Sequence, residues 1–207
     1  MEQNPRIKDV VISTLLVTPS GALSPGLLSA AAVASGATLG ALGGLMVSLG
    51  HVAVELPYLL VLTTMLSGIR ETLLKYKKIL SLIVLAFATF FAYGLVSGGG
   101  VPKVTVTDAL LAGIFFTASN VYFLLWWVTV GLPLVEMASA SKKHFVTMYL
   151  SHVWMDFAWL TLLSVMGKAL FVAAMSKLFN VALAMLMMLF AVDITLKSFI
   201  GKGFLPS

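Results

Sequence analysis

The chain consists of long apolar runs separated by short polar segments. No charged residue occurs between Asp9 and Glu55, and further apolar runs of comparable length follow. About 20 consecutive apolar residues are needed for a helix that crosses a lipid bilayer. The pattern therefore predicts six membrane-spanning helices, at roughly 10–34, 37–66, 79–98, 108–131, 145–167 and 178–200.

The composition agrees with this pattern and narrows the class of protein. Of the 207 residues, 60% are hydrophobic and 10% are charged, whereas a soluble domain has about 25% charged residues. The mean hydropathy is +1.05. These values predict an all-α, polytopic membrane protein with a single transmembrane domain spanning 1–207. The absence of cysteine excludes disulfides and thiolate metal sites.

The basic residues predict the orientation of the chain. With six spans they divide ten against three: Arg6, Lys8, Arg70, Lys75, Lys77, Lys78, Lys142, Lys143, Lys197 and Lys202 on one side, and Lys103, Lys168 and Lys177 on the other. Basic residues concentrate on the cytoplasmic side of membrane proteins. We therefore expect a multi-pass protein of the cell membrane with both termini in the cytoplasm. The basic residues do not alternate with aromatic ones, so a nucleic-acid partner is not expected.

Two histidine–acid pairs lie inside the predicted spans. His51 and Glu55 share a helical face because they are four residues apart, and so do His152 and Asp156. A carboxylate at the centre of a spanning helix costs about 2.5–3.5 kcal/mol on insertion scales. Each histidine could simply bond its own acid and join helices. Histidine can also titrate near neutral pH, so these four residues are candidates for binding protons or substrate.

The two pairs also reveal an internal repeat. Residues 47–59 and 148–160 align with matching Leu, His, Val and Leu, and each histidine is followed by an acid four positions later. One segment belongs to the second predicted span and the other to the fifth. An offset of three spans makes the second half enter the membrane from the opposite side. We therefore expect a 3+3 inverted repeat, with halves at about 8–100 and 104–202.

The first span of each half contains helix-breaking or polar residues. Ser24, Pro25 and Gly26 predict a break in the first span, because proline removes a backbone donor. Irregular backbone at that depth occurs only where protein or a water-filled cavity surrounds it. Ser119 and Asn120 lie at the matching depth of the fourth span, with Tyr122 nearby. We interpret these three residues, together with Ser24, Pro25 and Gly26, as candidates for contact with substrate.

Other polar and aromatic residues in the spans have simpler interpretations. Asp193 is four residues before Lys197 near the end of the last span, so a local ion pair is expected. Trp126 and Trp127 are expected to pack against other helices or to contact lipid. Ser48 and Ser151 lie near the histidines but not in a recognisable catalytic motif, so an enzyme is not expected.

Three motifs together carry a family resemblance. They are Ser24-Pro25-Gly26 with the following glycines, Thr117–Phe123 running into Trp126-Trp127 and Gly131, and Ser151-His152 with Asp156 and Trp159. In their order and spacing the chain resembles the LysE superfamily of amino-acid exporters, most closely its archaeal-type members. The resemblance covers the whole chain.

The resemblance implies a secondary transporter that expels amino acids, cationic or small and neutral. It also implies that transport is coupled to protons or another counter-ion and that the protein works as a homodimer in the lipid bilayer. No cofactor is expected. Relatives in the wider superfamily export divalent metals such as manganese or cadmium. Two carboxylates and two imidazoles could also bind such a cation, so metal export is the alternative.

Overall fold

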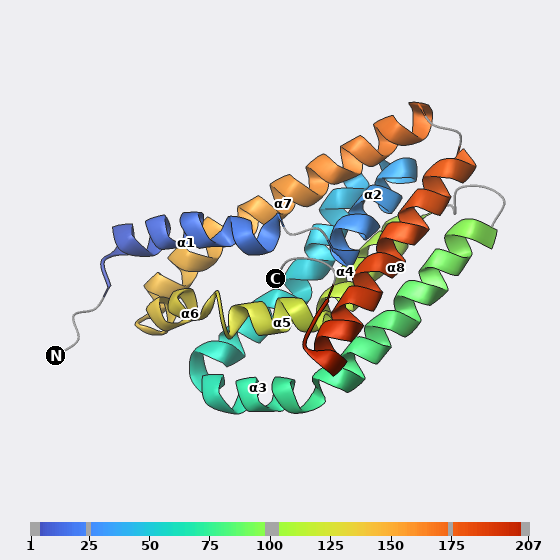
Figure 1. Ribbon diagram of the computed structural model, residues 1–207. Helices are drawn as coiled ribbons and strands as arrows, with labels where there is room; N and C mark the ends of the chain where they lie inside the picture. The colour runs from blue at the N-terminus through green and yellow to red at the C-terminus, as the bar shows by residue number, and fades with distance from the viewer. Residues whose placement is uncertain (1–4, 24–25, 98–103, 174–175, 204–207) are drawn as a thin grey trace.

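The computed structural model of the protein describes residues 5–23, 26–97, 104–173 and 176–203 and is built from helices (Figure 1). No strand occurs among these residues. The helices are α1 Ile7–Ala22, α2 Leu27–Leu39, α3 Ala41–Ser97, α4 Val106–Ala118, α5 Val121–Trp127, α6 Leu132–Ser139, α7 Lys142–Ala173 and α8 Ser176–Ile200. The prediction of an all-α fold is confirmed for the described residues.

The apolar run 10–34 forms two helices. Helix α1 ends at Ala22 and α2 begins at Leu27, and the two are bent by 74° relative to each other. The interruption falls at the stretch in which proline and glycine predict a break. Ser24 and Pro25 themselves lie outside the described residues, whereas Gly26 precedes α2 in an extended conformation.

The run 108–131 is also divided, so the expectation of one continuous helix is wrong here. Helix α4 ends at Ala118 and α5 begins at Val121. The Oδ1 atom of Asn120 accepts a hydrogen bond from the backbone N–H of Phe123, at 3.3 Å. Asparagine favours helix starts because its side chain satisfies a free backbone donor there. The chain then leaves α5 through a turn and enters α6.

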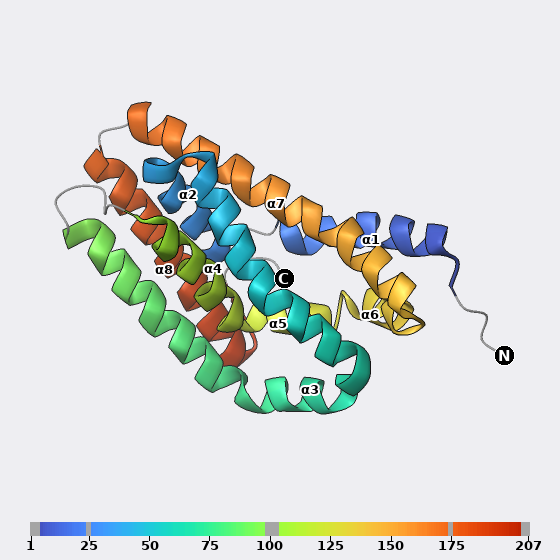
Figure 2. The ribbon, with the colours of Figure 1, turned by 180° about the vertical axis from the view of Figure 1, so that it is seen from behind.

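Helix α3 contains two of the predicted spans and the segment between them. It runs for 57 residues, and its backbone departs from helical geometry at Met65, at φ −135° and ψ 35°. Its first arm, Ala41–Met65, is long and apolar enough to cross a membrane alone, and within the described residues the bent pair of α1 and α2 passes the same test together. The second arm of α3 lies along α8, and α2 lies along α7 (Figures 1 and 2).

Glycines allow these helices to approach closely. A Cβ atom at Gly50 would collide with the carbonyl oxygen of Leu110, and one at Gly113 with that of Val47, so α3 and α4 touch backbone to backbone. Gly36 and Gly167 make equivalent contacts between α2 and α7. Small residues of this kind are typical of helix contacts in membranes, where close packing replaces the hydrophobic effect.

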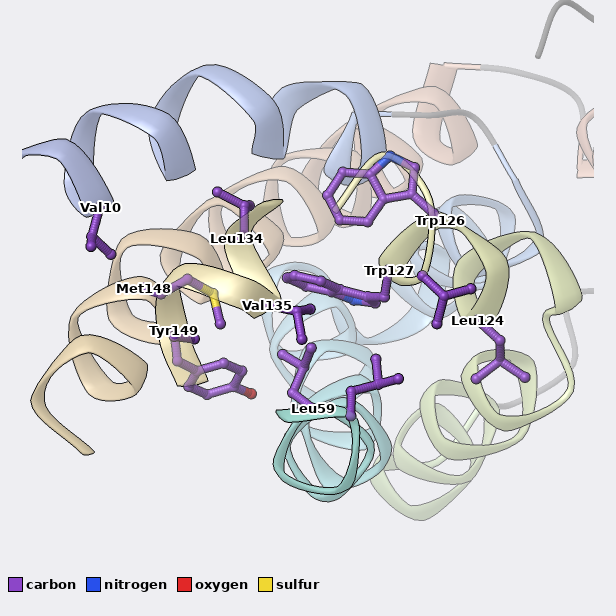
Figure 3. Packing of buried hydrophobic residues seen from close by; sticks show 12 residues of the cluster. Val10, Leu59, Leu124, Trp126, Trp127, Leu134, Val135, Met148 and Tyr149 are labelled. Atoms are coloured by element: carbon purple, nitrogen blue, oxygen red, sulfur yellow. The ribbon is translucent and has the colours of Figure 1, made fainter. Parts of the chain in front are cut away.

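A separate cluster of larger apolar residues lies where α1, α3, α5, α6 and α7 meet. Figure 3 shows the indole of Trp127 among Leu59, Val135 and Trp126. Trp127 and Leu59 are completely buried. This cluster fixes the end of α5 against α3 and α7, the two helices that carry the histidine–acid pairs.

Candidate functional site

The two histidine–acid pairs form one buried cluster. The Nε2 atom of His152 lies 3.1 Å from Oε1 of Glu55 and 3.1 Å from Oδ2 of Asp156. The Nε2 atom of His51 lies 3.3 Å from the same Glu55 oxygen and 3.9 Å from the same Asp156 oxygen. All four residues are at most 5% exposed. Each carboxylate therefore faces both imidazoles, one from its own helix and one from the other helix.

Two threonines hold the opposite sides of the imidazole rings. The Nδ1 atom of His51 is 3.0 Å from Oγ1 of Thr117 in α4, and the Nδ1 atom of His152 is 2.9 Å from Oγ1 of Thr18 in α1. Both threonines are buried. Each histidine is thus anchored by a residue from the other half of the chain, in a reciprocal arrangement.

The bonding of Thr117 fixes the position of one hydrogen. Its hydroxyl donates to the carbonyl oxygen of Gly113 at 2.6 Å, so it can only accept from Nδ1 of His51. The Nδ1 atom of His51 therefore carries a hydrogen, and its Nε2 atom carries one only when the ring is charged. An unprotonated Nε2 beside an ionised Glu55 would place two lone pairs against each other. The contact consequently requires a proton on one of the two groups.

The cluster lines a cavity of about 330 Å³. The cavity wall also includes Gly26 at the start of α2 and Asn120 at the α4–α5 break, so both interrupted helices reach it. The same wall includes Lys77, Asp193 and Lys197. Protons and small solutes thus have room beside the four titratable groups.

Comparison with known proteins identifies the family to which the chain belongs. The LysE type translocator family matches residues 19–198, which is most of the chain. The protein belongs to the LysE type translocator family. No curated protein and no solved structure matches it. Members of this family are membrane transporters of small solutes such as amino acids, not enzymes, so this translocator has a membrane and a small-molecule substrate as its partners.

Of the other residues predicted to contact substrate, some line the cavity and others do not. Gly26 and Asn120 line the cavity. Ser119 is not part of the cavity wall, and its hydroxyl donates to the carbonyl oxygen of Phe115 at 2.6 Å, inside α4. Tyr122 belongs to α5, but its side chain lies outside the described part of the structure, as do Ser24 and Pro25.

Trp127 is a member of the translocator's site that sequence reasoning assigned to packing or lipid contact. Its Nε1–H donates to Oε1 of Glu55 at 3.3 Å, and its ring meets that of His152 edge to face at 4.8 Å. Three groups therefore converge on one carboxylate oxygen, while Oε2 of Glu55 has no hydrogen-bond partner within the described residues. Lipid contact is excluded for Trp127, because the side chain is completely buried.

Thr18 and Thr117 were also missed, although the predicted repeat contained a signal for them. The stretches 18–21 and 117–120 occupy corresponding places in the two predicted halves, and each begins with threonine. A buried threonine at equivalent depth in both halves is a candidate partner for a buried imidazole. Helix α1 brings Thr18 to His152, and α4 brings Thr117 to His51.

Replacement of Thr117 by valine is expected to release the ring of His51 while keeping the side-chain volume. The buried Nδ1–H of His51 then lacks its acceptor, which costs about 1–3 kcal/mol of unfolding free energy. Nitrogen NMR of histidine-labelled protein in detergent should show a changed proton distribution on His51. The T117S variant keeps the hydroxyl group, so its spectrum should match that of the wild type. T89V is the matched control, because Thr89 makes the same bond to the carbonyl four residues earlier but is exposed. An unchanged His51 signal in T117V would contradict the assignment.

Proposed function

We propose that the protein is a proton-coupled secondary transporter that exports amino acids, cationic or small and neutral, across the cell membrane. The observation that carries this proposal is the buried cluster of two imidazoles and two carboxylates in the wall of a solute-sized cavity. Buried ionisable residues of this kind in membrane transporters serve as ion or proton sites by default. Membership of the LysE type translocator family supplies the transport class.

The cluster suits proton exchange because its charge can change without rearrangement of the backbone. A proton between His51 and Glu55 satisfies their contact, and the second pair offers the same chemistry. When the side-chain ammonium of a cationic amino acid approaches these carboxylates, it can replace a proton as the positive partner. Proton loss and substrate binding would thereby be linked, as an exchange mechanism requires.

We further propose six spans arranged as a 3+3 inverted repeat, with cytoplasmic termini and a homodimeric assembly. The reciprocal bonds of Thr18 and Thr117 to the histidines support the repeat, since a two-fold relation predicts paired contacts of this kind. In this topology, the wall residues Lys77 and Lys197 belong to the cytoplasmic side. The glycine contacts of α2 with α7 and of α3 with α4 close the opposite side, so the structure fits a conformation open to the cytoplasm.

Export of a divalent metal is the second candidate. One ligand atom each from His51, Glu55 and Asp156 lies within 4.8 Å of the others, and all three residues are buried. Imidazole and carboxylate ligands suit borderline divalent cations. In this alternative the metal is the cargo and occupies the place that we assign to protons.

Transport by the purified protein in proteoliposomes tests the proposal. Vesicles loaded with radiolabelled lysine, arginine, alanine or leucine should release at least one of them faster than protein-free vesicles. The release should accelerate when the external medium is made acidic, because protons then enter in exchange. Vesicles loaded with manganese or cadmium are the comparison. Metal release without release of any amino acid would support the alternative and overturn the proposal.

A further inference from the structure

The wall of the cavity also carries a charged group that the cluster does not explain. Asp193 and Lys197 of α8 form an ion pair, with Nζ of Lys197 2.9 Å from Oδ2 of Asp193. The local pair predicted from the sequence is confirmed. Asp193 is buried, at 3% exposure. Both residues line the same cavity as His51 and Glu55. The pair is therefore accessible to whatever occupies the cavity.

The end of the described chain fixes this ion pair. Helix α8 ends at Ile200, and Gly201 adopts a positive φ of 72°, a conformation that glycine adopts without strain. The chain then turns back so closely that a Cβ atom at Gly203 would collide with Oδ1 of Asp193 and the aliphatic part of Lys197. The carboxylate and the ammonium are thus held at the cavity wall by the backbone.

Lys77 supplies a second ammonium group on this wall. It is half-buried in the second arm of α3, and no carboxylate lies within 4 Å of it among the side chains that the structure describes. Its neighbours differ: Lys75 and Lys78 are exposed, their ammonium groups lie over the rings of Tyr76 and Phe199, and neither lines the cavity. Lys77, Lys197 and Asp193 thus bring two ammonium groups and one carboxylate to the cavity wall.

We propose that Lys77, Lys197 and Asp193 form a binding site for the zwitterionic head of a free α-amino acid. The ammonium groups of Lys77 and Lys197 receive the substrate carboxylate through charge-assisted hydrogen bonds. The carboxylate of Asp193 receives the substrate α-amino group. This inference rests on the proposed function, because it names the part of an amino acid that binds away from the histidine–acid cluster.

The arrangement of charges explains why this site selects an amino acid. A simple amine would meet an excess of positive charge, and so would a divalent cation. A simple carboxylic acid would meet Lys77 but would carry no ammonium group for Asp193. A ligand that carries an ammonium and a carboxylate group on the same carbon atom satisfies the three side chains together. The site is thus a selectivity element, whereas the histidine–acid cluster serves for coupling.

The lysines of one helical segment offer a matched test. In proteoliposomes that export an amino acid, K77Q should raise the half-saturating concentration of that amino acid by about 10-fold or more, since a hydrogen-bonded charge is lost. K75Q and K78Q should behave as the wild-type protein, because their side chains do not reach the cavity. The melting temperatures of all three variants should match that of the wild type.

Competition by analogues identifies the group that is recognised. The methyl ester of the exported amino acid lacks a free carboxylate, so it should inhibit wild-type transport weakly and should inhibit K77Q transport equally weakly. If wild-type protein exports the amino acid but K77Q has the same half-saturating concentration as K75Q, this inference is wrong and the proposed function stands. If wild-type protein exports no amino acid, the proposed function fails, and the site fails with it.

Discussion

Replacement of Glu55 by glutamine is expected to abolish amino-acid export driven by a pH gradient, with a loss of about 100-fold or more, the usual contribution of a positioned proton-transfer group. Glutamine has nearly the same shape as glutamate but cannot bind and release a proton. Oε1 of Glu55 is the atom on which both imidazoles and the indole of Trp127 converge. Its ionisation therefore affects both imidazoles and the indole at once.

The measurement is the release of a radiolabelled amino acid from proteoliposomes with and without an acidic external medium. D156N should show a comparable loss, because Asp156 contacts the same two histidines. E136Q is the control, since Glu136 is an exposed acid of α6 outside the cavity wall. Circular dichroism and a monodisperse elution profile in detergent establish that the variants are folded. Wild-type release by folded E55Q and by folded D156N would refute the assignment of the cluster to coupling.

Replacement of Gly50 by valine is expected to prevent stable folding. The first added carbon would collide with the carbonyl oxygen of Leu110 and crowd the backbone of Gly113 and Ile114. These are backbone atoms of α4, so only separation of the two helices relieves the collision. Overpacking costs about 1–3 kcal/mol where side chains can adjust, and more where they cannot. We expect a loss of at least about 3 kcal/mol, measured as a lower melting temperature in detergent or as loss of folded protein.

G26A is the matched control for this variant. A Cβ atom at Gly26 would have no heavy atom within 4 Å, and the residue has an extended backbone that alanine also adopts. The melting temperature of G26A should therefore lie close to that of the wild type. A G50V protein with an unchanged melting temperature would show that α3 and α4 are not in backbone contact.

Part of the site could be predicted because a helix places residues at four-residue intervals on one face. This spacing paired each histidine with its acid, and the predicted repeat placed the two pairs at equivalent depth in the membrane. The sequence could not reveal that each carboxylate faces both imidazoles, because this depends on how α3 and α7 pack. Gly44 of α3 sets that packing, because a Cβ atom there would collide with the carbonyl oxygen of Leu160 in α7, but its partner cannot be read from the sequence.

The remaining differences have physical causes of the same kind. Apolar composition favours a continuous helix at 108–131, but the side chain of Asn120 binds a backbone N–H and starts a new helix instead. The sequence leaves Trp127 open between packing and lipid contact, and only the packing of α5 against α3 and α7 shows that it is buried. Lys77 looks like one member of a basic cluster, and only the register of α3 separates it from Lys75.

The parts of the histidine–acid cluster are synthesised at different times. Glu55 and His152 are separated by 97 residues, which a ribosome needs about 5–20 seconds to add. During that interval the nascent chain carries a membrane-embedded carboxylate that has only His51 as its imidazole partner. A carboxylate at the centre of a spanning helix is costly, so we expect Glu55 to stay neutral or hydrated until α7 is added. Completion of α7 supplies the second imidazole, so a helix made late in synthesis stabilises a carboxylate that was buried early.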